Sequence, residues 1–159
     1  MAIQFPNYAP AGYALDYTDF LKTKAAKDGA ARIITGSVTV AAGATVGQII
    51  GLFPFNKGFK LAYGSSFVFG AFGASVTLAL GWYYNDTATG SSNTAGYLAA
   101  SSTAAAGGTV VPNVLAGQTF SAAGDGWVVA LVGGATTGNS AAVTYNCLFA
   151  YDISGVTNA

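Results

Sequence analysis

Residues 75–84, SVTLALGWYY, decide the fold class. Large apolar residues occupy every second position of this stretch: Val76, Leu78, Leu80, Trp82 and Tyr84. Because successive side chains of a strand point to opposite faces, this alternation predicts a β-strand with one apolar face. The charge-free region that contains it, 61–84, is long enough for a membrane-spanning helix. Its many Gly and Ser residues and its strict alternation favour strands instead.

The same two-residue period recurs on both sides of this stretch. Before it, we expect strands over residues 32–40, 48–55 and 59–72, the last of them broken or bulged near Gly64 and Gly70. After it, we expect a polar loop over 85–93, a short strand or helical turn over 97–102, a weak edge strand within 104–117, and strands over 127–132 and 142–152. About eight short strands without a long helix predict an all-β fold, an antiparallel β-sandwich of jelly-roll type.

The composition argues against catalysis. The chain has 159 residues, of which 52% are hydrophobic and only 8% charged, and it contains neither His nor Glu. These two residue types supply most general acids and bases, so we expect no enzyme, no cofactor and no metal site. The net charge of zero offers no basic field for nucleic acid. The single cysteine, Cys147, alternates with core-type residues and is interpreted as a buried, inert thiol rather than a nucleophile.

Charge divides the chain into two parts. All six basic residues precede position 61, and beyond it only three aspartates are charged. Residues 1–31 therefore read as an N-terminal arm, and residues 32–159 as the sandwich domain. Pro6 and Pro10 favour an extended chain at the start of the arm, while a short helix over 16–27 is compatible with early aspartates and late lysines. The arm lies along another surface or packs back on its own domain.

Aromatic residues suggest where the protein makes contacts. In the arm they recur every three to five residues and are followed by lysines, which gives a candidate set of partner-binding residues: Phe5, Tyr8, Tyr13, Tyr17, Phe20, Lys22, Lys24 and Lys27. In the sandwich, Trp82 and Tyr84 share the apolar side of their strand, so core packing is favoured over a sugar-stacking platform. Tyr83 points the other way and is a candidate exposed contact. Asp125, between two glycines, is interpreted as a turn residue.

The run from Ile49 to Tyr84 resembles the central hairpins of small β-sandwich proteins of phage virions. The features that carry the resemblance are an apolar strand, the Lys57-Gly58 turn, the FKLAYGSSFVF strand, the Gly73-Ala74-Ser75 turn and the SVTLALG strand. The closing segment TTGNSAAVTYNCLFAYDI is similar to the last hairpin of that class. The resemblance implies a capsid decoration (cement) or head-associated protein, typically a jelly-roll trimer seated on the shell with its N-terminal arm as anchor.

On this basis we expect a virion structural protein that is made in the host cytoplasm and binds the outside of a phage capsid. Its expected partners are the major capsid protein and other copies of itself, in a homotrimer, with no nucleic acid and no membrane. The alternative is a carbohydrate- or receptor-binding module of a fibre or spike that uses Tyr83 and the loops 85–93 and 133–141. A shell-forming capsid protein is a further possibility within the structural class.

Overall fold

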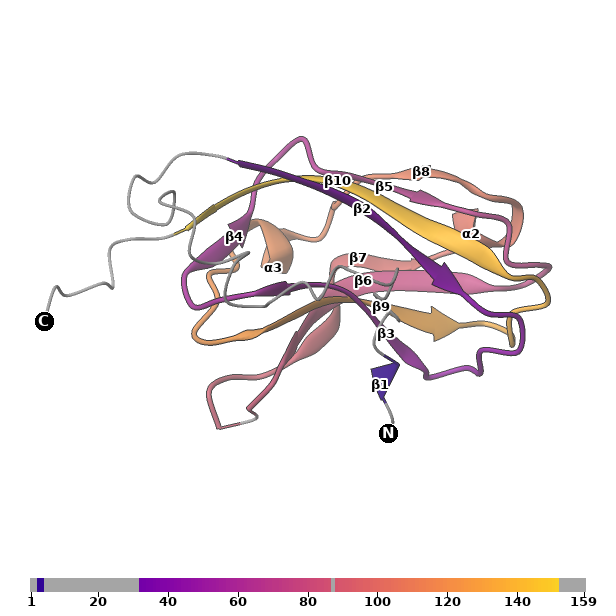
Figure 1. Ribbon diagram of the computed structural model, residues 1–159, viewed down its shortest axis with the longest axis horizontal. Coiled ribbons are helices and arrows are strands. Elements are labelled where there is room, and N and C mark those ends of the chain that lie inside the picture. Colours follow the sequence, from indigo (N-terminus) through magenta and orange to yellow (C-terminus); the bar gives the residue numbers. More distant parts are fainter. Residues whose placement is uncertain (1–2, 5–31, 87, 152–159) are drawn as a thin grey trace, which may run out of the picture.

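The computed structural model describes residues 3–4, 32–86 and 88–151, and in this part of the chain two β-sheets lie face to face (Figure 1). Sheet A has the order β1 (Ile3–Gln4), β3 (Ile49–Phe55), β9 (Gly126–Gly133), β6 (Thr77–Tyr84), β7 (Asn93–Ser101). Sheet B has the order β2 (Arg32–Val40), β10 (Ala141–Tyr151), β5 (Ser66–Phe69), β8 (Gly108–Val110), and β4 (Phe59–Leu61) also pairs with β10. All pairs are antiparallel except β1 with β3.

The wiring of the two sheets is that of a jelly roll. Along the chain, only β4–β5 and β6–β7 follow one another within one sheet, and every other connection from β2 to β10 crosses between the sheets. The first and last strands of the domain, β2 and β10, are hydrogen-bonded neighbours over nine residue pairs. This arrangement closes the sandwich and confirms the predicted all-β, antiparallel fold.

The predicted strands are confirmed, and two segments add detail. Residues 104–117 contain the predicted edge strand as β8, which pairs with β5 at the end of sheet B and lies between α2 (Thr103–Ala106) and α3 (Leu115–Gln118). Gly107 and Gly108 both have positive φ, so α2 ends there and the chain changes direction before β8. Residues 59–72 form two strands with the predicted break at Gly64, which turns the chain with φ +95°. The charge-free region 61–84 is thus built of strands and turns, and no helix among the described residues is long and apolar enough to cross a membrane.

Aromatic rings fill the space between the sheets. The ring of Phe59, only 2% exposed, stacks on Phe55 of sheet A and on Phe149 of sheet B, with centroids 5.2 and 5.6 Å apart. A second group of rings surrounds Phe120, a residue of the loop after α3. The ring centroids of Phe120 and Trp82 lie 4.0 Å apart. Trp82 and Tyr84 are both buried, so the prediction that they pack in the core is confirmed.

Strand β6 departs from simple alternation because its outward face is also covered in part. Ala79, on that face, is buried, and a β-carbon on Gly81 would overlap the backbone of Asn93 and Thr94. The pairing of β6 with β7 is irregular at this point, since the register shifts between Leu80 and Trp82. The start of β7 therefore presses against Gly81, and only a glycine fits there.

Removing one ring of this aromatic layer should lower the stability of the fold strongly. We expect Phe59→Ala to lower the free energy of unfolding by about 3–5 kcal/mol, because the ring bridges both sheets and its loss leaves a cavity. As a control, Val46→Ala in a turn, where the side chain is 57% exposed, should change it by less than about 0.5 kcal/mol. Denaturant unfolding measures both values, and equal effects of the two substitutions would contradict the role given to Phe59.

Candidate interaction surfaces

The predicted arm residues Phe5, Tyr8, Tyr13, Tyr17, Phe20, Lys22, Lys24 and Lys27 lie outside the described residues. Of residues 1–31 the structure describes only β1. This two-residue strand pairs in parallel with the first residues of β3, Ile3 opposite Ile49 and Gln4 opposite Ile50. Residues 3–4 therefore form the edge strand of sheet A next to β3.

The outer face of sheet A is apolar. A row of three side chains crosses it from β3 to β6, with Pro54 opposite Trp127 and Trp127 opposite Tyr83. All three are half-buried. The next rows along the same face hold no charge either, but all their members except Leu131 are buried: Gly51, Val129 and Gly81, then Ile49, Leu131 and Ala79. Tyr83 thus lies in the partly exposed row of an apolar face whose next rows are mostly buried, and its role as a contact residue stays a prediction.

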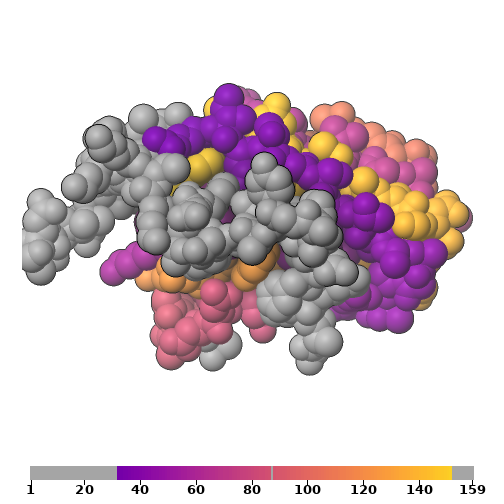
Figure 2. All heavy atoms as spheres, viewed as in Figure 1, coloured from indigo at the N-terminus to yellow at the C-terminus, as the bar shows by residue number. Residues whose placement is uncertain are grey.

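The outer face of sheet B is different in chemistry. Apart from Ile33, which is 67% exposed, its exposed positions on β2 and β10 carry short uncharged polar side chains: Thr35, Ser37, Thr39, Thr144 and Asn146. The hydroxyls of Ser37 and Thr144 lie 3.1 Å apart across the two strands. In the space-filling view, atoms of β2 and β10 lie side by side along the upper surface (Figure 2).

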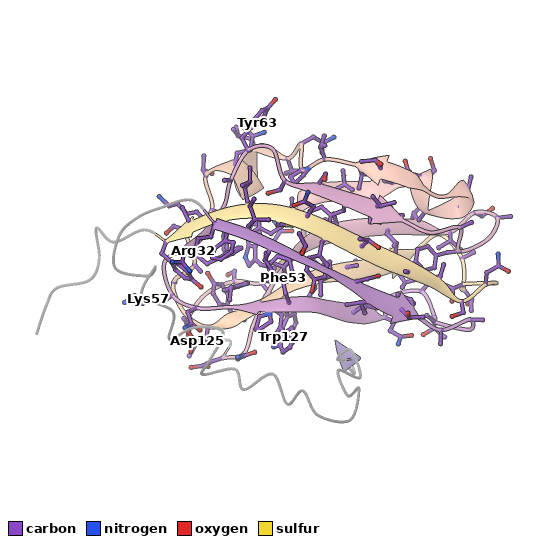
Figure 3. The ribbon with its side chains drawn as sticks, turned by 45° about the horizontal axis from the view of Figure 1, so that its top comes forward. Arg32, Phe53, Lys57, Tyr63, Asp125 and Trp127 are labelled. Atoms are coloured by element: carbon purple, nitrogen blue, oxygen red, sulfur yellow. The ribbon has the colours of Figure 1, made fainter. Side chains whose placement is uncertain are left out.

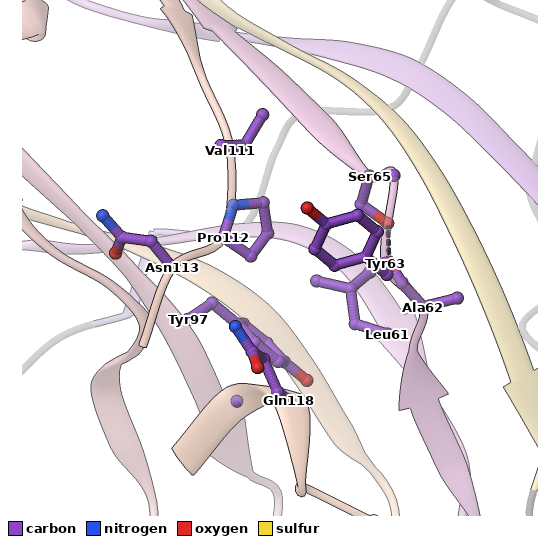
Figure 4. Close-up of a pocket in the computed structure, with 11 residues that line it drawn as sticks. Leu61, Ala62, Tyr63, Ser65, Tyr97, Val111, Pro112, Asn113 and Gln118 are labelled. Atoms are coloured by element: carbon purple, nitrogen blue, oxygen red, sulfur yellow. Dashed lines mark hydrogen bonds between the residues drawn. The ribbon is translucent and has the colours of Figure 1, made fainter. Parts of the chain in front are cut away.

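A pocket opens between the turn that joins β4 to β5 and the segment that joins β8 to α3 (Figure 4). We call it the Tyr63 pocket, and it has a volume of about 430 Å³. Its lining residues are Leu61, Ala62, Tyr63, Gly64, Ser65, Tyr97, Val111, Pro112, Asn113, Gly117 and Gln118. None of them is charged. The side chain of Tyr63 is 93% exposed and stands out from the surface, on the side of the sandwich opposite Trp127 (Figure 3).

The first wall of the Tyr63 pocket is a tight turn. Gly64 follows Tyr63 with positive φ, a conformation that costs a glycine little. The Ser65 hydroxyl fixes the turn by donating to Ala62 O at 2.8 Å or Leu148 O at 3.0 Å, and it accepts from Leu148 N at 3.0 Å. This hydroxyl therefore joins the turn to β10 and leaves Tyr63 at the outer corner.

The second wall is held by Tyr97 of β7. The backbone N–H groups of Asn113 and Val114 both donate to Tyr97 O, at 2.9 and 3.1 Å. The backbone of Gly117 packs directly against Tyr97, since a β-carbon on Gly117 would overlap the Tyr97 ring. Sequence reasoning missed this pocket because its walls come from segments about fifty residues apart. The one local signal was Tyr63 itself, a large aromatic residue followed by the turn residues Gly64 and Ser65.

The buried titratable groups Cys147 and Tyr97 are packed in the hydrophobic core. Burial raises the pKa of the Cys147 thiol to about 12, and a hydrogen bond with the Ser65 side chain offsets part of that rise. Burial also raises the pKa of Tyr97 well above its usual value, with smaller contributions from Tyr84 and Cys147. The Tyr97 hydroxyl has no hydrogen-bond partner among the described residues. In the same part of the chain no three His, Cys, Asp or Glu side chains gather to form a metal site.

Asp125 occupies the predicted turn. Its carboxylate accepts a hydrogen bond from the backbone N–H of Lys57 at 3.3 Å, which links the turn before β9 to the turn after β3. The side chain is exposed at one end of the sandwich. Its contacts are those of a turn residue.

Comparison with solved structures finds the same fold in phage particles. The chain is similar to one in the capsid of Ralstonia phage GP4, with a TM-score of 0.58 and 19% identity over 79% of this chain and 87% of that one. It is also similar to a chain of the cyanophage Pam1 capsid asymmetric unit, with a TM-score of 0.54 and 15% identity over 78% and 86% of the two chains. No protein-family model matches the sequence, and no curated protein does. At these identities the likeness shows that the fold is shared.

The raised pKa of Cys147 predicts an unreactive thiol. At pH 8 the folded protein should react with iodoacetamide at least about 100-fold more slowly than the unfolded protein, because thiolate is the reacting form. The pKa is higher in the folded state, so this group should favour unfolding only as the pH rises above about 9, where the unfolded thiol ionises first. Mass spectrometry of the alkylated protein with and without denaturant measures the difference. Equal rates in both states would contradict the burial of Cys147.

Proposed function

We propose that this protein is a virion structural protein that binds the outside of a phage capsid and stabilises it as a decoration (cement) protein. The observation that carries the proposal is the jelly roll it shares with chains of two phage capsid structures, over more than three quarters of its length. The shared part includes most of the sandwich, so the whole domain, and not one motif, resembles those chains. The function is binding and no chemistry is required of it.

The surface chemistry supports an assembled state. A soluble domain usually covers itself with charged residues, about a quarter of its sequence, whereas this chain has 8%. The outer face of sheet A has an uncharged apolar row of Pro54, Trp127 and Tyr83 that keeps part of its area exposed. Aromatic residues are the type most enriched at the centres of protein interfaces. Such a face is suited to contact with a neighbouring subunit.

The N-terminal arm is proposed as the capsid anchor. Its aromatic residues Phe5, Tyr8, Tyr13, Tyr17 and Phe20 would supply buried anchors on the major capsid protein. The lysines at 22, 24 and 27 would steer the arm towards an acidic shell surface. If the protein is a homotrimer, three arms bind together, and effective concentration raises the affinity of each modest contact.

Deleting residues 1–27 tests the anchor. The remaining chain keeps every strand of the sandwich except β1, which contributes only two residue pairs at the edge of sheet A. We therefore expect a folded protein, by circular dichroism and thermal unfolding, that no longer co-sediments with undecorated capsids of the parent phage. A fold lost on deletion would show that the arm is part of the domain.

A second variant separates the aromatic contacts from the loss of β1. Replacing Phe5, Tyr8, Tyr13, Tyr17 and Phe20 by Ala keeps the length of the arm and leaves Ile3 and Gln4 in place. This variant should bind capsids at least about tenfold more weakly, since each lost aromatic anchor costs about 1–2 kcal/mol or more. Undiminished decoration by both variants would overturn the anchor role.

A further inference from the structure

We propose that the Tyr63 pocket binds one ring of an uncharged carbohydrate. Its described lining residues belong neither to residues 1–31 nor to the outer face of sheet A, so the proposal does not depend on capsid binding. Its volume of about 430 Å³ falls within the usual range of small-ligand sites. It also lies at different residues from those that the sequence suggested for a sugar site, Tyr83 and its neighbouring loops.

The uncharged lining of the pocket excludes a charged ligand. None of the described residues that line it is Asp, Lys or Arg, so neither a phosphate nor an acidic sugar would find a counter-charge among them. The rim carries a Tyr63 ring that is 93% exposed although it is large and apolar. An exposed aromatic face matches the C–H face of a sugar ring, which is flat, apolar and neutral. Val111 and Pro112 form the apolar side opposite (Figure 4).

The primary amide of Gln118 lies among the lining side chains of the pocket, whereas that of Asn113 is turned away from Tyr63 (Figure 4). The side chains of Asn113 and Gln118 make no hydrogen bond to another described residue, and both are exposed. Each amide offers two donors and an acceptor, the combination that sugar hydroxyls require, because a hydroxyl both donates and accepts. An apolar side chain that covered the Gln118 amide would leave it without a hydrogen-bond partner, at a cost of about 1–3 kcal/mol. This difference favours a polyol over an apolar anchor.

The pocket is preformed. Ser65 ties the Tyr63 turn to Leu148 of β10, and Tyr97 O ties the other wall to β7 through two backbone N–H groups. Gly117 allows α3 to rest directly on the Tyr97 ring. Because both walls are held by the sandwich, ligand binding would not have to order a loop, and the affinity is not reduced by that cost.

The test is an NMR titration of the full chain with four neutral sugars: glucose, galactose, mannose and N-acetylglucosamine. We expect at least one to shift backbone signals of residues 62–65 and 111–118, with a Kd in the millimolar range, as suits a single ring. Tyr63→Ala should weaken binding at least about tenfold, which corresponds to about 1.4 kcal/mol. Gln118→Leu should weaken it as well, because Leu keeps the size but removes the amide.

Two controls make the outcome decisive. Tyr83→Phe and Val46→Ala lie away from the pocket and should leave the titration unchanged. Since Tyr63 and Gln118 are exposed, thermal unfolding should show that their variants fold normally. No shift with any of the four sugars at about 10 mM, tenfold above a Kd of 1 mM, would overturn the proposal. So would shifts that persist in Tyr63→Ala, or signals in this pocket that respond only to a second copy of the chain or to the capsid.

Discussion

The structure depends on the contact between aromatic rings across the two sheets. The sheets share no strand, so side-chain packing must hold them together. The ring centroids of Phe53 in sheet A and Tyr145 in sheet B lie 4.9 Å apart, and those of the stacked rings of Phe55 and Phe59 lie 5.2 Å apart. Each large ring buries more apolar area than an aliphatic side chain, which compensates for a chain with few ion-pairing residues.

Much of this fold could be predicted from the sequence, wherever a strand alternates regularly between apolar and other residues. Strand β2 has the bounds expected from its two-residue period, and β3, β6, β9 and β10 differ from expectation by one or two residues at an end. The burial of Trp82, Tyr84 and Cys147 also followed from alternation. Within residues 104–117 the weak edge strand was predicted, but the two short helices that flank it, α2 and α3, were not, because Ala and Gly have little preference for either element. There the positive φ angles of Gly107 and Gly108 decide the path, and periodicity cannot reveal them.

The candidate site could not be predicted in the same way because it is not local. The Tyr63 pocket forms where a turn after β4 meets the segment before α3, and both are positioned through Tyr97 and Leu148 on other strands. The sequence shows which residues form each wall, but it does not show that the two walls lie side by side in the fold. The two surfaces also serve different chemistry: Trp127 and Tyr83 form part of an apolar sheet face, while Tyr63 stands over an uncharged pocket on the opposite side (Figure 3). A protein seated on a shell by one surface would leave the other available to solvent.

The measurement that tests the central claim most directly is a map of the parent phage particle by electron cryomicroscopy at subnanometre resolution. The account predicts density for the jelly roll on the outside of the shell, repeated with the symmetry of the capsid and joined to it by residues of the arm. Absence of this protein from purified particles would contradict the account. Density only within the continuous shell itself would contradict the decoration role, since that is the position of a shell-forming subunit.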